Sequence, residues 1–347
     1  MQNKTYLIGE IGQNHNGSVD IAKVIIDLIS RPIHDDVFGN ELKGMDAVKL
    51  TKRDLSQELS NSEMNRIYNN SNSFGKTYGE HRKFLELNDE EHFEIYQHAK
   101  SKELEFVETL CAVGCLSIFK YFSPDKLKVA SRDLTNLPLL EALAETNIPI
   151  ILSTGMSGQN ELNDALDIIS KYHENISILH CVSQYPTKPK NVNLRTINFL
   201  RNNYSNYSIG YSDHTIGIST PIAAVSLGAK IIEKHITLDR GMKGTDHQCS
   251  LGPDGVKRMV RDIRTLNLCL GEEKMYIVDE TKDTKNKLER SIATNKSLKK
   301  GHVLKNSDLH LLSPGDGFKW SNINKVLNKT LKVDLGKDEI IYENLIK

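Results

Sequence analysis

Two histidines, His214 and His235, have the chemistry and the spacing of a pair of metal ligands. Each follows a short apolar segment that we expect to be a strand, Tyr207–Tyr211 and Ala229–Glu233 respectively, and one strand–helix–strand unit separates them. The carboxyl ends of consecutive parallel strands lie side by side and face the same way. Two neutral imidazoles at these ends could form half of a divalent-metal site, with open positions for water or substrate.

A single histidine at a strand end is more often a capping or packed residue than a ligand. The metal interpretation is favoured here because two histidines occur in adjacent units and because three carboxylates, Asp213, Glu233 and Asp246, lie close to them in the chain. The spacing alone does not identify the metal.

Most of the other apolar segments also end in residues that carry ammonium, carboxylate or hydroxyl groups. These are Glu10, Lys49, Glu108, Lys128, Ser131, Ser153, Ser183, Tyr185 and Ser212. Lysines and hydroxyls at the ends of separate strands suit a phosphate or carboxylate of a small anionic substrate. A metal ion beside them suits polarisation of a carbonyl. Together they predict carbon–carbon or carbon–oxygen chemistry on a phosphorylated metabolite, provided that the fold brings these ends together.

Strands and helices alternate strictly through residues 1–270. We expect strands over residues 6–11, 45–50, 105–110, 127–130, 148–152, 176–181, 207–211 and 229–233. A helix is expected after each, for example over Val19–Ser30 and Val113–Phe122. Eight such units predict a closed (β/α)8 TIM barrel, an α/β fold, over a doubly wound sheet. No Gly-x-Gly-x-x-Gly motif follows the first strand, which argues against dinucleotide binding.

The chain changes character after the barrel. Residues 271–289 are rich in charge and are expected to form a linker. Residues 290–347 carry short strand patterns over 291–294, 331–333 and 340–342, and they predict a small α+β domain.

A long polar connection runs from Lys52 to Asn88, after the second expected strand. A connection of this length inside a compact domain is either disordered or functional. In a barrel it would lie on the catalytic face, where it could serve as a lid. The alternative is a surface excursion without a role.

Composition excludes several classes of partner. The chain has 45 basic and 45 acidic residues, so no charge excess indicates nucleic acid or an anionic membrane surface. No apolar segment approaches the length of a transmembrane helix, and the first residues lack the pattern of a signal peptide. The five cysteines are odd in number and scattered, which predicts reduced thiols and a cytoplasmic location.

Several segments together resemble the motifs of the sialic acid synthase family. They read GEIGQNHNGSVDIAK, DAVKL, ILSTGM, ILHCVSQYPTKPKNVNLR, IGYSDHTIGI and IIEKHITLD, and the C-terminal segment resembles an antifreeze-like (SAF) domain. Members of this family condense phosphoenolpyruvate with an N-acetylated amino sugar. The resemblance implies a metal-dependent transferase on a (β/α)8 barrel. It also implies a homodimer in which the SAF domain covers the partner's active site.

The resemblance also implies roles for individual residues. The catalytic set is Glu10, Lys49, His214 and His235, with the two histidines as ligands of Mn or Mg. The residues implied to hold phosphoenolpyruvate are Lys49, Lys128, Ser131, Ser153, Ser183 and Ser212. The residues implied to contact the sugar are Tyr185 and Asp246, with Asn72 as a weaker match in the long connection. Asp133, also a substrate-binding candidate, stands close to the position of a family Glu.

The chain departs from the family motifs mainly where the sugar is held. Thr51 lies in the segment where the family often has Lys-x-Gln-Thr, Ser183 replaces an Asn, and Ser313 replaces the Arg of an Arg-Pro-Gly motif. We therefore expect a conventional phosphoenolpyruvate site and a sugar other than plain N-acetylmannosamine. A deoxy or diacetamido relative would give a product resembling legionaminic or pseudaminic acid.

Two alternatives remain. One is a phosphoenolpyruvate-dependent synthase that uses a phosphorylated aldose; the scarcity of basic groups for a second phosphate and the SAF-like segment argue against it. The other is a non-catalytic carbohydrate-binding homologue. The presence of both histidines, both lysines and Glu10 argues against that alternative, because a binding protein needs none of them.

Overall fold

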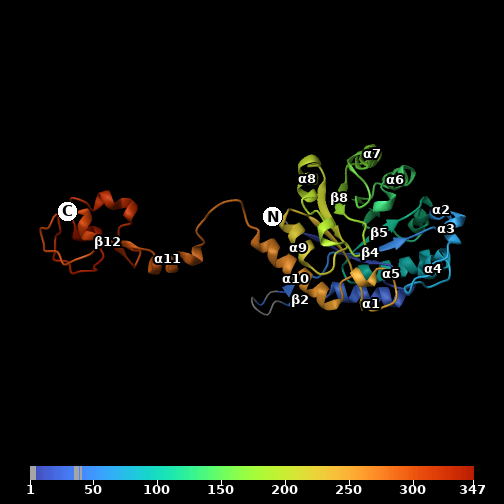
Figure 1. Cartoon of the computed structure of the whole chain (residues 1–347), viewed down its shortest axis with the longest axis horizontal. Helices are drawn as coiled ribbons and strands as arrows, with labels where there is room; N and C mark the ends of the chain where they lie inside the picture. Colours follow the sequence, from blue (N-terminus) through green and yellow to red (C-terminus); the bar gives the residue numbers. More distant parts are fainter. Residues whose placement is uncertain (1–4, 35–38, 40) are drawn as a thin grey trace. The chain divides into compact units, whose positions relative to one another are not determined.

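A computed structural model describes residues 5–34, 39 and 41–347. Within these residues, eight parallel strands close into a barrel in the order β1-β10-β9-β8-β7-β6-β5-β4 (Figure 1). The strands are β1 Tyr6–Gly12, β4 Ala47–Lys52, β5 Glu105–Leu110, β6 Lys126–Val129, β7 Ile150–Ser153, β8 Ile176–Cys181, β9 Ser208–Asp213 and β10 Ile231–His235. The predicted (β/α)8 barrel is confirmed. Strands β9 and β10 each extend two residues further than expected.

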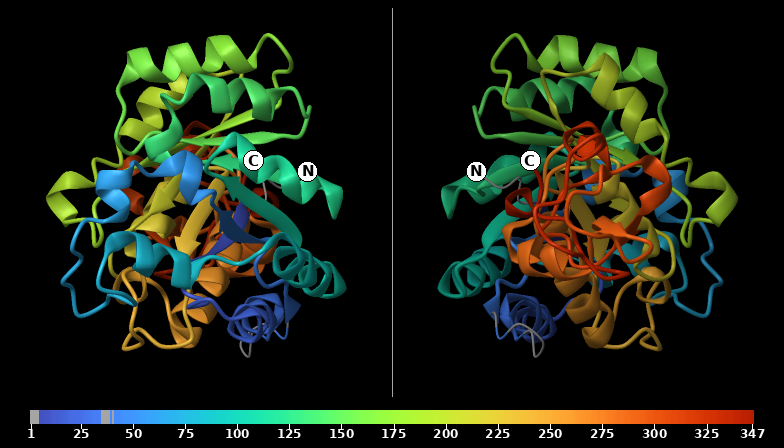
Figure 2. Two further views of the ribbon diagram at one scale, coloured as in Figure 1. Left: turned by 90° about the vertical axis from the view of Figure 1, so that its right-hand side faces the viewer. Right: turned by 90° about the vertical axis from the view of Figure 1, so that its left-hand side faces the viewer.

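Helices surround this barrel (Figure 2). They are α1 Val19–Ser30, α5 Asp89–Ser101, α6 Leu137–Ala144, α7 Gln159–Ile169, α8 Thr196–Asn203, α9 Ser219–Ser226 and α10 Pro253–Cys269. A two-stranded sheet of β2 Ile33–His34 and β3 Glu41–Leu42 follows α1. The helix expected over Val113–Phe122 is instead a 3-10 helix over Val113–Lys120. No side chain caps its start, and 3-10 turns are common as short connectors.

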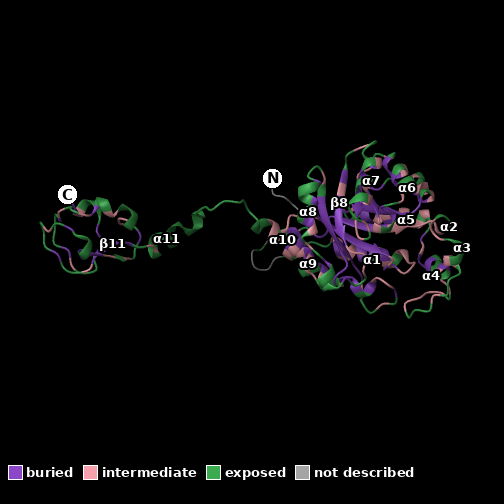
Figure 3. Cartoon of the chain, turned by 45° about the horizontal axis from the view of Figure 1, so that its top comes forward, coloured by how far each residue is buried: buried purple, intermediate pink, exposed green. Residues whose placement is uncertain are grey.

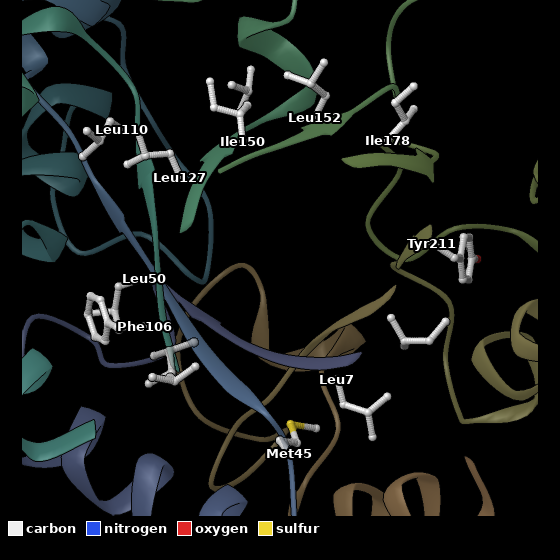
Figure 4. Close-up of a cluster of buried hydrophobic side chains, with 14 of the residues drawn as sticks. Leu7, Met45, Leu50, Phe106, Leu110, Leu127, Ile150, Leu152, Ile178 and Tyr211 are labelled. Carbon is white, nitrogen blue, oxygen red and sulfur yellow. The ribbon is translucent and has the colours of Figure 1, made fainter. Parts of the chain in front are cut away.

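Two layers of apolar side chains hold the barrel together. The inner layer fills the barrel and consists of Ile8, Ala47, Val107, Ile151, Leu179 and Ile231. Side chains on the other face of the strands, such as Leu7, Leu50, Phe106 and Leu152, pack beneath the helices (Figure 4). Successive residues of a strand point to opposite faces. Once the inner residues are known, the remaining side chains of the same strands can be assigned to the inside or the outside of the barrel.

The connection from Lys52 to Asn88 is ordered. It contains three short helices, α2 Leu55–Glu58, α3 Asn61–Met64 and α4 Tyr78–Leu85. The first two begin with side-chain caps from Asp54 and Ser60, and α4 begins with a capping box formed by Thr77 and Glu80. A stacked pair of rings, Phe74 on Phe84 at 4.5 Å, adds an aromatic contact of its own.

A second compact unit covers residues 272–347, so the division by contacts falls after Gly271. Residues 272–288 are exposed (Figure 3) and end in α11 Lys282–Leu288. The unit contains an antiparallel pair, β11 Ser291–Thr294 and β12 Leu309–Leu312. Its own apolar core consists of Ile292, Leu298, Leu304, Leu309, Val326, Leu331, Leu335, Ile341 and Ile346. The strands expected over 331–333 and 340–342 are only isolated bridges, Leu331 to Ile346 and Ile340 to Ala293. No helix of the described residues is long and apolar enough to cross a membrane.

Helix α10 is fastened to the amino-terminal end of the barrel by Arg264. This side chain is only 6% exposed. It donates hydrogen bonds to the carbonyl oxygens of Thr5 at 2.7 Å and Gly44 at 2.8 Å, and to Asp46 Oδ2 at 2.7 Å. Hydrogen bonds from a buried cation to several partners are expensive to lose together.

We expect Arg264→Met to lower the free energy of unfolding of the barrel by about 3 kcal/mol, because buried acceptors lose their donor. Denaturant unfolding measures the change. Arg258→Met on the exposed face of the same helix is the control and should change stability by less than about 0.5 kcal/mol. Equal effects of the two substitutions would contradict the fastening role of Arg264.

Candidate active site

The pleat of the strands puts polar side chains directly above the inner apolar layer. Two positions beyond Ile8, Ala47 and Ile231 along their strands stand Glu10, Lys49 and Glu233. The same step leads from the inner residues of β5, β7 and β8 to Thr109, Ser153 and Cys181. These side chains therefore point into the mouth of the barrel at the carboxyl ends of the strands, where barrel enzymes have their active sites.

A cavity of about 330 Å³ opens at this mouth. Most of the residues predicted for the site line it: Glu10, Lys49, Lys128, Ser131, Ser153, Ser183, Tyr185, Ser212, His214, His235 and Asp246. The barrel thus brings together side chains from β1, β4, β6, β7, β8, β9 and β10 and from the loops that follow them.

Three sequence candidates lie elsewhere. Asn72 is half-buried on the long connection and does not line the cavity. Asp133 is buried and pairs with Arg132 Nε at 3.2 Å, also outside the cavity lining. Glu108 was expected to point into the site at the barrel mouth, and this expectation was wrong. Its neighbour Thr109 points into the barrel, so Glu108 points outward, where it lies 3.1 Å from His92 Nδ1 of α5.

Four buried charges alternate in the floor of the cavity. Lys49 Nζ lies 2.5 Å from Glu10 Oε2 and 3.7 Å from Glu233 Oε1, and Lys128 Nζ lies 3.6 Å from Glu233 Oε2. Thr109 accepts a hydrogen bond from Lys49 at 3.1 Å. All four charged side chains are almost completely buried, so each ion is tolerated only because the others compensate it.

Burial and charge separate the two carboxyls in acidity. Burial raises the pKa of Glu10, and Lys49 offsets this only in part. Burial would also raise the pKa of Glu233, but Lys128 and Lys49 outweigh it and lower that pKa to about 2. Glu233 is therefore a fixed anion, whereas Glu10 is the carboxyl that can exchange a proton near neutral pH. Burial lowers the pKa of Lys128, and Glu233 opposes this effect.

Hydroxyl groups surround the lysines. Ser153 Oγ accepts a hydrogen bond from Lys128 at 2.6 Å, and Ser212 Oγ donates to Glu233 at 2.9 Å. Ser131 Oγ accepts from the backbone N–H of Gly155 at 2.9 Å. A Cβ at Gly155 would stand 2.5 Å from Ser183 Oγ and 2.7 Å from Ser131 Oγ, so only glycine lets these two hydroxyls approach the β7 end.

His214 and His235 face each other, with ring centroids 5.4 Å apart. His214 Nδ1 lies 2.9 Å from the carbonyl oxygen of Val182, so this nitrogen donates its hydrogen and Nε2 carries the free lone pair. Burial lowers the pKa of His235 and favours the neutral ring, and its buried Nδ1 has no hydrogen-bond partner in the described chain. His214 Nε2 and His235 Nδ1 are thus the ring nitrogens that remain open to a metal ion.

The two histidines would supply two nitrogen ligands to a metal ion. Among residues 5–34, 39 and 41–347, no three His, Cys, Asp or Glu side chains are grouped so that they could hold a metal ion. The donor set therefore fits a metal that takes its remaining ligands from water or substrate, and the predicted metal stays a prediction.

Several cavity residues were missed by sequence reasoning. Thr109 and Cys181 were detectable, because they lie two positions beyond apolar residues of the inner layer. Arg53, Tyr78, Arg82 and Arg132 were not, because the fold of the 52–88 connection and of the loop after β6 decides where they point. The expectation that basic groups are scarce was wrong, since three arginines line the cavity in addition to the two lysines.

Fold and site define a (β/α)8 barrel with a cavity at its mouth that is lined by lysines, arginines, carboxylates and hydroxyl groups. Comparison with known proteins agrees with this class. The NeuB family matches residues 40–275 and the SAF domain matches residues 289–347. The chain therefore belongs to the NeuB family.

Two curated relatives and one solved structure are named for synthases. The chain is 32% identical to N-acetylneuraminate-9-phosphate synthase of Drosophila melanogaster, over 98% of this chain and 95% of the relative. It is 32% identical to N,N'-diacetyllegionaminic acid synthase of Legionella pneumophila, over 95% and 91%. The structure of N-acetylneuraminic acid synthetase from Leptospira borgpetersenii in complex with citrate is 30% identical, with a TM-score of 0.66 over 82% of this chain and 90% of that one. The prediction of an enzyme of the transferase class that forms a carbon–carbon bond is confirmed.

The buried lysines give the site a direct test of anion binding. We expect inorganic phosphate to raise the thermal unfolding temperature of the barrel, since a ligand at 100 times its Kd stabilises by about 2.7 kcal/mol. Lys128→Met should weaken this effect by at least about tenfold in apparent Kd, because a charge-assisted contact is lost. Lys126→Met, at the opposite end of β6, is the control and should keep the response. A full response in Lys128→Met would show that anions bind elsewhere.

Proposed function

We propose that the protein condenses phosphoenolpyruvate with the open-chain form of an N-acetylated amino sugar, releases phosphate and forms a nonulosonic acid. The observation that carries this proposal is the floor of the cavity, where Lys49 and Lys128 alternate with Glu10 and Glu233 beneath the two histidines. The named products of the relatives, N-acetylneuraminate-9-phosphate and N,N'-diacetyllegionaminic acid, support it.

Phosphoenolpyruvate carries a phosphate and a carboxylate on adjacent atoms. Lys49 and Lys128 would neutralise these groups, and the hydroxyls around them would donate hydrogen bonds to the oxygens. The hydroxyl donors proposed for this role are Ser131, Ser153, Ser183 and Ser212. Since the lysine ammonium groups are already desolvated, little further desolvation is needed when the ligand arrives.

His214 and His235 are the residues that would hold Mn or Mg. When bound there, the metal ion would polarise the aldehyde carbonyl of the sugar. Tyr185, whose ring centroid lies 4.0 Å from that of His214, and Asp246 would position the sugar beside it.

The reaction then forms a bond between carbon 3 of phosphoenolpyruvate and the aldehyde carbon. Water adds at carbon 2, and the tetrahedral intermediate loses phosphate by cleavage of its carbon–oxygen bond. Glu10 would accept the proton of that water, because burial has raised its pKa, while Glu233 stays ionised and holds both lysines in place. The barrel mouth is open to solvent, so we further propose a homodimer in which the SAF domain of one subunit covers the site of the other.

The first test is release of phosphate from phosphoenolpyruvate in the presence of amino-sugar aldehydes. We expect release with Mn or Mg and at least one aldehyde of a panel containing N-acetylmannosamine, its deoxy-diacetamido relatives and its 6-phosphate. A chelator should abolish this release. No release with any aldehyde, neutral or anionic, would refute the proposal.

The histidines give a second test. We expect His214→Ala and His235→Ala to lower kcat by about a thousandfold or more, because the carbonyl loses its electrophilic partner. Thermal unfolding should show that both variants fold, and Mn titration followed by electron paramagnetic resonance should show loss of the bound metal. His98→Ala, which removes only a surface contact with Asp27, should keep full activity. Full turnover in either site variant would contradict the metal assignment.

A further inference from the structure

Three arginines line the same cavity as the proposed catalytic groups, and the mechanism above uses none of them. Arg53 follows β4, Arg82 lies in α4, and Arg132 lies in the 3-10 turn over Ser131–Asp133. Two of them therefore come from the 52–88 connection and the third from the loop after β6. Such a concentration of guanidinium groups indicates recognition of a planar or tetrahedral anion.

One carboxylate oxygen shows how close the three guanidinium groups are. Glu58 Oε1 lies 2.8 Å from Arg53 Nη1, 3.3 Å from Arg132 Nη1 and 4.0 Å from Arg82 Nη2. Glu86 lies 3.5 Å from Arg53 Nε, and Asp133 lies 3.2 Å from Arg132 Nε. The arginines line the cavity and these carboxylates do not. The carboxylates therefore pair with the arginines from outside the cavity lining.

Arg82 is the least satisfied member of this cluster. Its side chain is only 6% exposed, and its Nε and Nη2 have no hydrogen-bond partner within the described chain. Burial, followed by the charge of Arg53, lowers the pKa of Arg82. A buried guanidinium with unused donors is costly, and an anion that enters the cavity would pair with them.

The cluster lies further out along the chain than the lysines. Arg53 comes four residues after Lys49 and Arg132 four residues after Lys128, and four extended residues span at most about 13 Å. The lysines and hydroxyls of the floor already provide for the two anionic groups of phosphoenolpyruvate. Arg53 and Arg132 follow the ends of β4 and β6, whereas Lys49 and Lys128 lie within these strands, so the arginines are available to the second substrate.

We propose that Arg53, Arg82 and Arg132 bind an anionic substituent, a phosphate or a carboxylate, carried by the amino sugar. This inference rests on the proposed function and specifies its second substrate as an anionic aldose.

The experiment compares phosphate release from phosphoenolpyruvate with three aldoses: N-acetylmannosamine, its 6-phosphate and the corresponding uronate. We expect kcat/KM for one of the anionic aldoses to exceed that for the neutral aldose by about tenfold to a hundredfold, the range of a hydrogen-bonded charge pair. The better of the two anionic aldoses identifies the group as a phosphate or a carboxylate.

Substitutions then locate the selectivity. Arg82→Gln should raise KM for the anionic aldose by about tenfold or more and leave KM for phosphoenolpyruvate within about twofold. Arg132→Gln should also raise KM for the anionic aldose. The Arg132 side chain is 33% exposed, so this substitution should disturb folding less than Arg82→Gln. Lys83→Gln is the matched control, because it removes one positive charge from the next residue of α4, outside this cavity lining.

Three results would overturn the inference. The neutral aldose could be the best substrate in both the unaltered protein and the arginine variants, which would leave the proposed function intact. The KM of phosphoenolpyruvate could rise instead, which would assign the cluster to that substrate. If no aldose supports phosphate release, the proposed function fails, and calorimetry of the aldose phosphate and the uronate decides separately. Binding that Arg82→Gln abolishes would support the anion site, and absence of binding would refute it.

Discussion

The structure depends most on the mutual compensation of four buried charges at the mouth of the barrel. Lys49 contacts both Glu10 and Glu233, and Lys128 contacts Glu233 from the other side. Removing water from four ions is tolerable only when signs alternate and distances stay short. The strand register supplies those distances, because Glu10 pairs with Lys49 across β1 and β4 and with His235 across β1 and β10. An anionic ligand competes with these carboxylates for the same ammonium groups, so binding and fold share one set of interactions.

Much of the fold and of the site followed from the sequence. Strict alternation of strands and helices predicted the barrel, and most of the polar residues expected at the strand ends line the cavity. These predictions succeeded because they depend on short-range periodicity and on the parallel direction of the strands. Glu108 shows the limit of that reasoning: a shift of one residue along a strand reverses the face, and the inner face was fixed only once the apolar layer was known.

The remaining errors concern parts of the chain without a regular period. Asn72 and the three arginines lie in or beside loops whose path depends on tertiary contacts, so their direction was not readable from spacing. The 3-10 helix over Val113–Lys120 has an apolar pattern that also fits an α-helix, so the pattern did not distinguish the two. The histidines were found because they directly follow or end regular strands. The hydrogen bond of His214 to the Val182 carbonyl and the lowered pKa of His235, by contrast, depend on tertiary packing.

The 52–88 connection contains its own helix caps and ring contacts, and its side chains Glu58 and Gln57 contact the loops after β6 and β5. The floor of the cavity, in contrast, consists of side chains whose positions the sheet register fixes. Changes in the connection can therefore alter the shape and charge of the rim without disturbing strand pairing. In the proposed reaction, the two reactants would be recognised by parts of the chain that obey different folding constraints. One half of the specificity is tied to the integrity of the fold, and the other half is free to diverge.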